Sequence, residues 1–212
     1  MPYHEARFVA SIRLSVFGGR LRVEQLAGTK AIVSGFEKQL PQGDTRWLAY
    51  MLATAFHETA ATMQPVRETM AASDAEAIAR LDRAFAAGRL PMVREPYWRP
   101  DAEGKSWLGR GFVQLTHRRN YETMSAITGV DLLDRPERAM ALDVATAILI
   151  LGMVRGSFTG RRLSHFLSGA SEDWEGARAI INGSDRARLV AGYGRAFHAA
   201  LVAARIEPAP AR

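Results

Sequence analysis

The chain has 212 residues, 48% of them hydrophobic, which is enough to bury the core of one large domain. It contains no cysteine, so disulfide frameworks, thiolate zinc sites and thiol nucleophiles are excluded. Its formal charge of +6 favours anionic partners, such as nucleic acid, membrane surfaces or the acidic polymers of bacterial cell walls.

Apolar residues recur at steps of three and four along most of the chain, which predicts an all-α or mainly α protein with at most a small hairpin. Asp44 and Ser73 are good N-caps; Glu76 completes a capping box with Ser73, and Gly88 marks the end of the helix that follows. Helices are expected over residues 3–17, 22–38, 45–58, 73–87, 117–127, 136–154, 161–167, 172–181 and 185–203.

The N-terminal segment interrupts its apolar positions with Glu5, Arg7 and Arg13, so no secretory signal is expected. The most apolar stretch, residues 139–154, is short for a membrane span and carries Asp143 near its start. We interpret it as a buried core helix, and we expect no stable membrane insertion.

The helical pattern fails between residues 88 and 116, where prolines and glycines concentrate. Long irregular segments are usually functional surfaces or disordered linkers. The aromatic side chains of Tyr97, Trp98, Trp107 and Phe112 argue against disorder, and a short hairpin is expected over residues 104–116. No repeat or interdomain linker is evident, so residues 1–212 are expected to form one unit.

Several chemistries find no support in the residues. His57 and Glu58 are adjacent, but the second histidine of a zincin would stand at position 61, which is alanine. The histidines are scattered without ligand spacing, so neither a metal nor a cofactor is expected. The glycine-rich stretches lack the phosphate-loop pattern, and no serine lies in a nucleophile elbow.

A pair of glutamates is the remaining candidate. Hydrolysis of a glycosidic bond requires one carboxyl group that protonates the leaving oxygen and one carboxylate that activates water or attacks the sugar. Glu58 ends a strongly apolar helix, which suits the acid, whereas Glu68 lies in a more polar stretch beyond Pro65, which suits the base. Spacing alone does not distinguish this pair from two solvated glutamates.

Three segments in order resemble the catalytic domain of glycoside hydrolase family 19, which comprises plant-type chitinases and bacterial and phage endolysins. They are "AFHET" (55–59), "GRGFVQLTHRRNY" (109–121) and "ARAIING" (177–183). The resemblance covers roughly residues 45–200, and residues 1–44 are expected to belong to the same unit. It implies a lysozyme-like, two-lobed fold with a substrate cleft.

The resemblance also implies roles for single residues. Glu58 matches the general acid, and Glu68 resembles the carboxylate that activates water for inverting displacement, with Glu76 and Glu95 as alternatives. Such a mechanism implies carboxyl groups roughly 6.5–9.5 Å apart. The residues implied to hold substrate and water are Gln114, Thr116, Asn120 and Asn182.

Aromatic faces bind pyranose rings, so Tyr97, Trp98 and Trp107 are expected substrate contacts, unless they fill the core beneath the long loop. Arg110 either pairs with a catalytic carboxylate or pins its turn, and we favour the second role; His57 is interpreted as a packed side chain.

The sequence departs from the family in two places. "ETAATM" (58–63) stands where glycines usually follow the acid, and the segment after Asn182 is compressed. The second departure leaves open whether Arg188 or Arg195 faces the cleft.

The expected substrate is a polysaccharide. Peptidoglycan is favoured over chitin, because only peptidoglycan carries carboxylates that attract a basic protein. A basic chain without cysteines or a secretory signal suits a monomeric endolysin, made in the bacterial cytoplasm and released to the wall by a holin. A non-catalytic glycan-binding protein is the alternative, suggested by "ETAATM", whereas no motif supports nucleic-acid binding.

Overall fold

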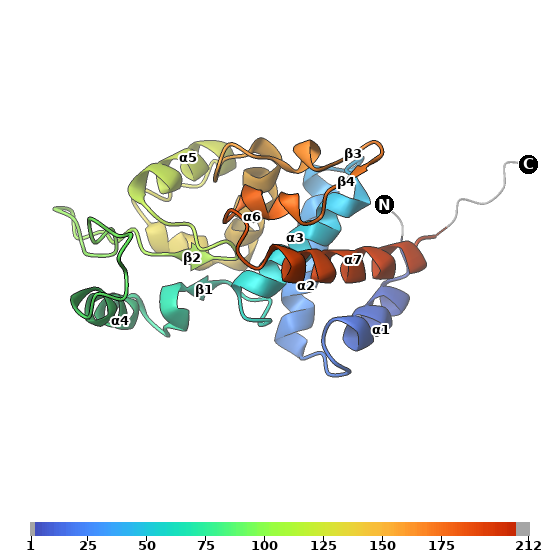
Figure 1. The fold of residues 1–212 in the computed structure, drawn as a ribbon, viewed down its shortest axis with the longest axis horizontal. Coiled ribbons are helices and arrows are strands. Elements are labelled where there is room, and N and C mark those ends of the chain that lie inside the picture. Colours follow the sequence, from blue (N-terminus) through green and yellow to red (C-terminus); the bar gives the residue numbers. More distant parts are fainter. Residues whose placement is uncertain (1–2, 207–212) are drawn as a thin grey trace, which may run out of the picture.

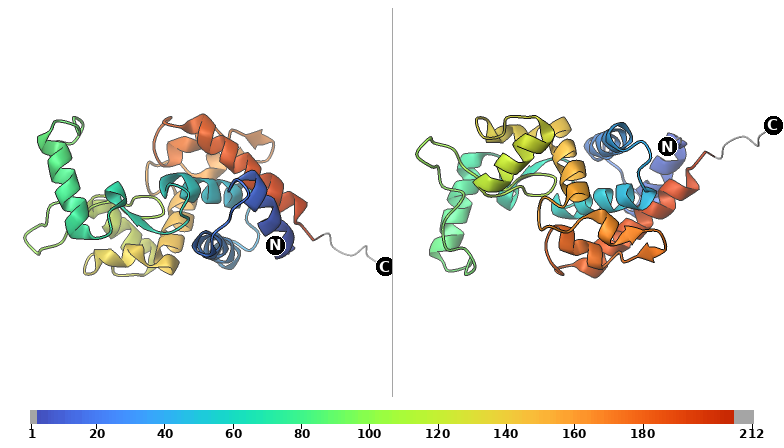
Figure 2. Two further views of the ribbon diagram at one scale, coloured as in Figure 1. Left: turned by 90° about the horizontal axis from the view of Figure 1, so that it is seen from below. Right: turned by 90° about the horizontal axis from the view of Figure 1, so that it is seen from above.

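The computed structural model describes residues 3–206, and it shows an elongated, mainly helical molecule with two lobes (Figure 1). Both described ends of the chain belong to the larger lobe, and α4 lies at the far end of the smaller one (Figure 2). The larger lobe contains α1 (Glu5–Ser15), α2 (Val23–Gln39), α3 (Thr45–Glu58) and α7 (Ala187–Ala203). The smaller lobe contains α4 (Asp74–Ala86) and α5 (Arg118–Thr128), and α6 (Leu142–Arg155) packs against α2, α3 and α5.

Helix α3 forms the centre of the larger lobe. Its residues from Leu48 to Phe56 are all buried, and it packs against α7, α2 and α6. The Asp44 carboxylate caps the helix by accepting a hydrogen bond from the backbone N–H of Arg46. The predicted range of this helix is confirmed, because a capped apolar run can be read directly from the sequence.

The smaller lobe has a hydrophobic cluster of its own. Trp98 stands at its centre, with Leu81 of α4 and Leu108 among the buried residues around it. The predicted Ser73 cap is confirmed, because its hydroxyl accepts the Glu76 N–H. The Glu76 carboxylate, however, accepts the N–H of Ala72 rather than that of Ser73.

Within the described residues, the strands form two short antiparallel pairs. β1 (Val66–Arg67) pairs with β2 (Arg110–Gly111), and β3 (Leu167–Ser168) pairs with β4 (Ser171–Glu172). The hairpin predicted over residues 104–116 is therefore wrong, because β2 pairs with β1 rather than with a second strand in that segment. β2 retains an isolated bridge between Arg110 and Leu115, but its strand partner lies far earlier in the chain.

Three predicted helices also need correction. The helix predicted over 136–154 is a 3-10 turn, η2 (Pro136–Met140), followed by α6, because Ala141 has an extended backbone between them. The helices predicted over 161–167 and 172–181 shrink to the 3-10 turns η3 (Leu163–His165) and η4 (Gly176–Ile180), with the β3–β4 hairpin between them. The remaining 3-10 turn, η1 (Glu68–Met70), follows β1.

No helix within residues 3–206 has the length and apolar character needed to cross a membrane. The apolar run of residues 142–155 is instead the α6 core helix that the sequence predicts.

Candidate functional site

Glu58 is the last residue of the buried helix α3. Its side chain is 16% exposed. The chain then turns sharply, because Ala60, Ala61 and Met63 all adopt left-handed backbone conformations. The family resemblance predicts glycines in this segment. Because alanine and methionine adopt left-handed conformations less readily than glycine, the turn carries backbone strain.

Helix α2 holds this strained turn in place. The Gln25 side chain donates a hydrogen bond to the carbonyl of Ala61, and the Gln64 side chain donates one to the carbonyl of Glu24. A Cβ atom on Gly28 would stand only 1.6 Å from the carbonyl oxygen of Met63, so only glycine permits this approach. Helix α2 therefore supports the segment that joins the two candidate carboxylates.

Arg178 of η4 binds the Glu58 carboxylate. Its Nη1 donates to Oε1 at 2.5 Å, and its Nε donates to the carbonyl of Asp185 at 2.9 Å. The Arg178 side chain is only 2% exposed, so the ion pair lies inside the protein. No further hydrogen bond to the Glu58 carboxylate is recorded among residues 3–206, which leaves Oε2 available to a ligand.

The sequence does not predict the role of Arg178. Arg188 and Arg195 are the candidates it offers for an arginine that faces the cleft, and neither forms an ion pair within the described part of the chain. The only signal in the sequence is its position, because Arg178 lies four residues before Asn182 in the "ARAIING" segment.

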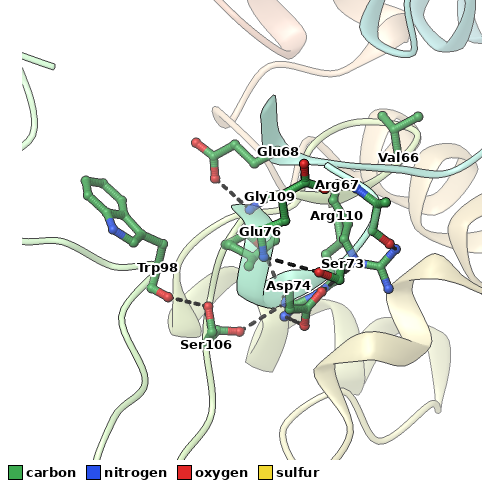
Figure 3. Close-up of polar contacts among 12 residues, drawn as sticks. Val66, Arg67, Glu68, Ser73, Asp74, Glu76, Trp98, Ser106, Gly109 and Arg110 are labelled. Atoms are coloured by element: carbon green, nitrogen blue, oxygen red, sulfur yellow. Dashed lines mark hydrogen bonds and ion pairs between the residues drawn. The ribbon is translucent and has the colours of Figure 1, made fainter. Parts of the chain in front are cut away.

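Glu68 follows β1 and is held by two donors. The Tyr97 hydroxyl donates to Oε1 at 2.6 Å. The backbone N–H of Gly109 donates to Oε2 at 2.8 Å (Figure 3). The backbone N–H of Glu68 also donates to the carbonyl of Gly109. These bonds fix the carboxylate against the glycine-arginine-glycine turn that the sequence singles out.

Three of the predicted residues surround Gly109. A Cβ atom there would stand 2.8 Å from Oε1 of Gln114, 3.2 Å from Cγ2 of Thr116 and 3.3 Å from Cβ of Glu68. Gln114 has a left-handed backbone, and its side chain donates to the carbonyl of Val66. A glycine is thus required where these side chains converge.

Gln114, Thr116 and Asn120 line one small hollow of about 160 Å³, which Ile181 also lines. The Asn120 amide donates to the carbonyl of Thr116, which closes the first turn of α5. Asn182 directly follows Ile181 and is exposed, so the C-terminal segment lies at the edge of this hollow. Three of the predicted substrate-binding residues, Gln114, Thr116 and Asn120, therefore share one hollow, and the C-terminal segment reaches the same hollow through Ile181.

The aromatic residues of the long loop differ in their positions. Tyr97 and Trp107 line a hollow of about 630 Å³, which Glu95 and His117 also line. Trp107 is largely buried, and its indole N–H donates to Asp101. The predicted substrate contact of Trp98 is wrong, because its indole is fully buried and donates to Asp82 of α4.

Arg110 has the structural role that the sequence predicts. Its fully buried guanidinium donates to Asp74 at 2.5 Å and to the Tyr121 hydroxyl at 2.8 Å. Arg67 donates to the other oxygen of Asp74, so both strands are tied to the start of α4 (Figure 3). Although burial raises the pKa of Asp74, the hydrogen bonds from Arg110 and Arg67 hold it below its ordinary value.

The alternative carboxylates have other surroundings. Glu76 accepts the N–H of Ala72 and the guanidinium of Arg80, which makes it part of the α4 cap. Glu95 lines the larger hollow near Tyr97. His57 is half-buried, and burial lowers its pKa, so it is neutral at pH 7, as a packed side chain would be.

No protein-family model and no curated protein matches this sequence. Among solved structures, a mutant of chitinase C is similar over 94% of this chain and 92% of its own, with a TM-score of 0.53 and 18% identity. The chain has the fold of a chitinase. A bacterial family 19 chitinase also matches, over 90% of this chain and 95% of its own, with 21% identity and a TM-score of 0.37.

The predicted fold class is thereby confirmed. The chain is mainly α, with the two-lobed, lysozyme-like arrangement that the motifs imply, and the similarity to chitinase C extends over nearly its whole length.

Proposed function

We propose that the protein is a glycoside hydrolase that cleaves β-1,4 bonds between N-acetylated amino sugars with inversion. The observation that carries the proposal is the placement of Glu68, fixed by Tyr97 and Gly109 beside the side chains of Gln114 and Thr116. Glu58 stands at the end of the buried helix α3, where the Arg178 guanidinium binds its carboxylate. Similarity to a chitinase in fold supports this assignment.

In this proposal, protonated Glu58 gives its proton to the glycosidic oxygen as the bond from that oxygen to the anomeric carbon breaks. Glu68 accepts a proton from water as the water oxygen forms a bond to the opposite face of the same carbon. Arg178 balances the charge that develops on Glu58 during the transfer, because it contacts Oε1 and leaves Oε2 for the substrate. After the step Glu58 is ionised and Glu68 is protonated, so one proton has been given and one has been accepted.

The sugar rings of the substrate would lie along the hollows next to these glutamates. Tyr97 and Trp107 offer aromatic edges in the larger hollow, and Gln114 and Asn120 offer amide groups in the smaller one. We favour peptidoglycan over chitin, since the charge of +6 attracts only the polymer that carries carboxylates.

A non-catalytic glycan-binding protein is the second candidate. It is favoured by the alanines at positions 60 and 61, which put methyl groups where the family usually has glycines. The same hollows would then hold a glycan without cleaving it.

One experiment distinguishes the two candidates. Wild type and Glu58→Gln are incubated with purified peptidoglycan and with chitin oligomers, and new reducing ends are identified by mass spectrometry. The glutamine keeps an oxygen that accepts the Arg178 hydrogen bond, so the variant is expected to fold. We expect new reducing ends from wild type and a loss of roughly 10²–10⁴-fold in the variant. Equal activity of both proteins, or none from wild type, would refute the catalytic role of Glu58.

The same assay identifies the base. Glu68→Gln should lose activity to a similar extent, whereas Glu76→Gln and Glu95→Gln should retain it. If Glu95→Gln is inactive and Glu68→Gln is active, Glu95 takes the role of the base.

A further inference from the structure

A third hollow, of about 680 Å³, is lined by residues at the start of α7 and in the turn before it. Arg186 and Arg188 line it, together with the apolar side chain of Leu189 and the ring of Tyr193. The hollow therefore combines cationic groups with an apolar surface.

The position of this hollow links it to the candidate acid. Arg178, which binds Glu58, also donates to the carbonyl of Asp185, the residue before Arg186. On the other side, the ring of Tyr193 packs against Phe56 of α3 with ring centroids 4.7 Å apart. The hollow is thus connected to Glu58 in two ways: Tyr193 packs on the helix that carries Glu58, and Asp185, next to the lining residue Arg186, contacts Arg178.

The two arginines of the hollow differ from the other arginines of the site. Arg67, Arg110 and Arg178 each form an ion pair with a carboxylate of the protein. Arg186 and Arg188 are exposed, and none of the ion pairs or hydrogen bonds recorded for residues 3–206 involves their side chains. Their guanidinium groups are therefore free to donate to a ligand.

We propose that this hollow binds an acidic substituent of the glycan, with its carboxylate on Arg186 and Arg188 and its aliphatic part on Leu189 and Tyr193. Guanidinium groups bind carboxylates through charge-assisted hydrogen bonds, and the apolar surface fits a stem of alkyl groups. The acidic peptide attached to the amino sugars of peptidoglycan has both features, whereas chitin has neither. The inference rests on the proposed function, and it assigns the preference for an acidic polymer to a local site rather than to net charge.

Binding tests the site independently of catalysis. The probe is a soluble muropeptide, a disaccharide with its acidic peptide, compared with the same compound after amidation of its carboxylates. Calorimetric titration of Glu58→Gln protein should show at least tenfold tighter binding of the acid form, because only a carboxylate accepts charge-assisted hydrogen bonds from the two guanidinium groups. In Glu58→Gln protein that also carries Arg186→Gln and Arg188→Gln, the two compounds should bind equally.

Activity provides the second comparison. Arg186→Gln/Arg188→Gln should lower kcat/KM on peptidoglycan about tenfold or more and change it less than about twofold on chitin oligomers. The matched control, Arg7→Gln/Arg13→Gln, removes two exposed charges from α1 and so has the same net charge. It should leave both rates within about twofold.

The outcomes separate the two proposals. Equal affinity of Glu58→Gln protein for the acid and amidated compounds would overturn the acidic subsite, even if both polymers are cleaved. An equal loss in the two double variants would also overturn it, since net charge would then explain the preference. If neither polymer is cleaved but binding remains selective for the acid, the proposed catalysis fails and the acidic subsite stands.

Discussion

Replacing Arg178 by glutamine removes the cation that holds Glu58. The Arg178 side chain is only 2% exposed, so water does not readily take its place, whereas the Glu58 side chain is 16% exposed. Removing one partner of a buried ion pair costs about 3–5 kcal/mol, and loss of the hydrogen bond to Asp185 adds about 1 kcal/mol. Because Glu58 regains part of its hydration at the mouth of the site, we expect the free energy of unfolding to fall by about 3 kcal/mol.

Urea unfolding followed by far-UV circular dichroism measures this change at pH 7. In a chain of this length, the expected loss also lowers Tm by roughly 6–12 °C. Arg188→Gln is the matched control, since Arg188 is exposed and its substitution should change stability by less than about 0.5 kcal/mol. A double-mutant cycle with Glu58→Gln should give a coupling free energy of at least about 1 kcal/mol. A loss below about 1 kcal/mol in Arg178→Gln, with no coupling, would refute the buried ion pair.

Three further substitutions test the supporting structure. Asp74→Asn should lower the free energy of unfolding by about 2 kcal/mol at pH 7, because it leaves the Arg110 guanidinium buried without a counter-charge. The pKa of Asp74 is lowered in the folded state, so its contribution is complete above the unfolded value of about 3.9 and is lost as the pH falls through the folded value. Denaturant midpoints of wild type and variant should therefore converge in acid, and a constant difference would contradict the ion pair. Ala60→Gly should raise the free energy of unfolding by roughly 1 kcal/mol, because Ala60 is exposed and has a left-handed backbone with φ of 48°. An unchanged urea midpoint would show that the turn is not strained. Tyr97→Phe should lower kcat on the cleaved polymer about tenfold with little change in KM, because Glu68 loses the hydroxyl that orients it. Unaltered kinetics would show that this hydrogen bond is dispensable.

The larger helices could be predicted from the sequence because their signals are local. Asp44 and Ser73 mark helix starts through side chains that reach only two or three residues along the chain, and the structure confirms both caps. The apolar periods of α3 and α7 likewise need no partner to be recognised. The resemblance of three short motifs then predicts the fold class, which similarity to chitinase C confirms.

The contacts that complete the site are not local and could not be predicted in this way. Arg178 meets Glu58 across 120 positions, and nothing in either segment alone specifies the other. β2 pairs with Val66 and Arg67 rather than only within the hairpin predicted over residues 104–116, and α4 and the long loop separate the two strands along the chain. The sequence leaves open whether Trp98 binds sugar or fills the core beneath the long loop, and only the structure shows that the smaller lobe uses this side chain for its own core.

The most direct test of the account is the anomeric configuration of the first product. Proton NMR of the new reducing end, recorded within minutes of adding enzyme to peptidoglycan or to chitin oligomers, distinguishes inversion from retention before mutarotation mixes the anomers. With Glu58 as the acid and Glu68 activating water, a β-1,4 bond must yield the α-anomer first. Initial formation of the β-anomer, or the absence of any new reducing end from both polymers, would contradict the account.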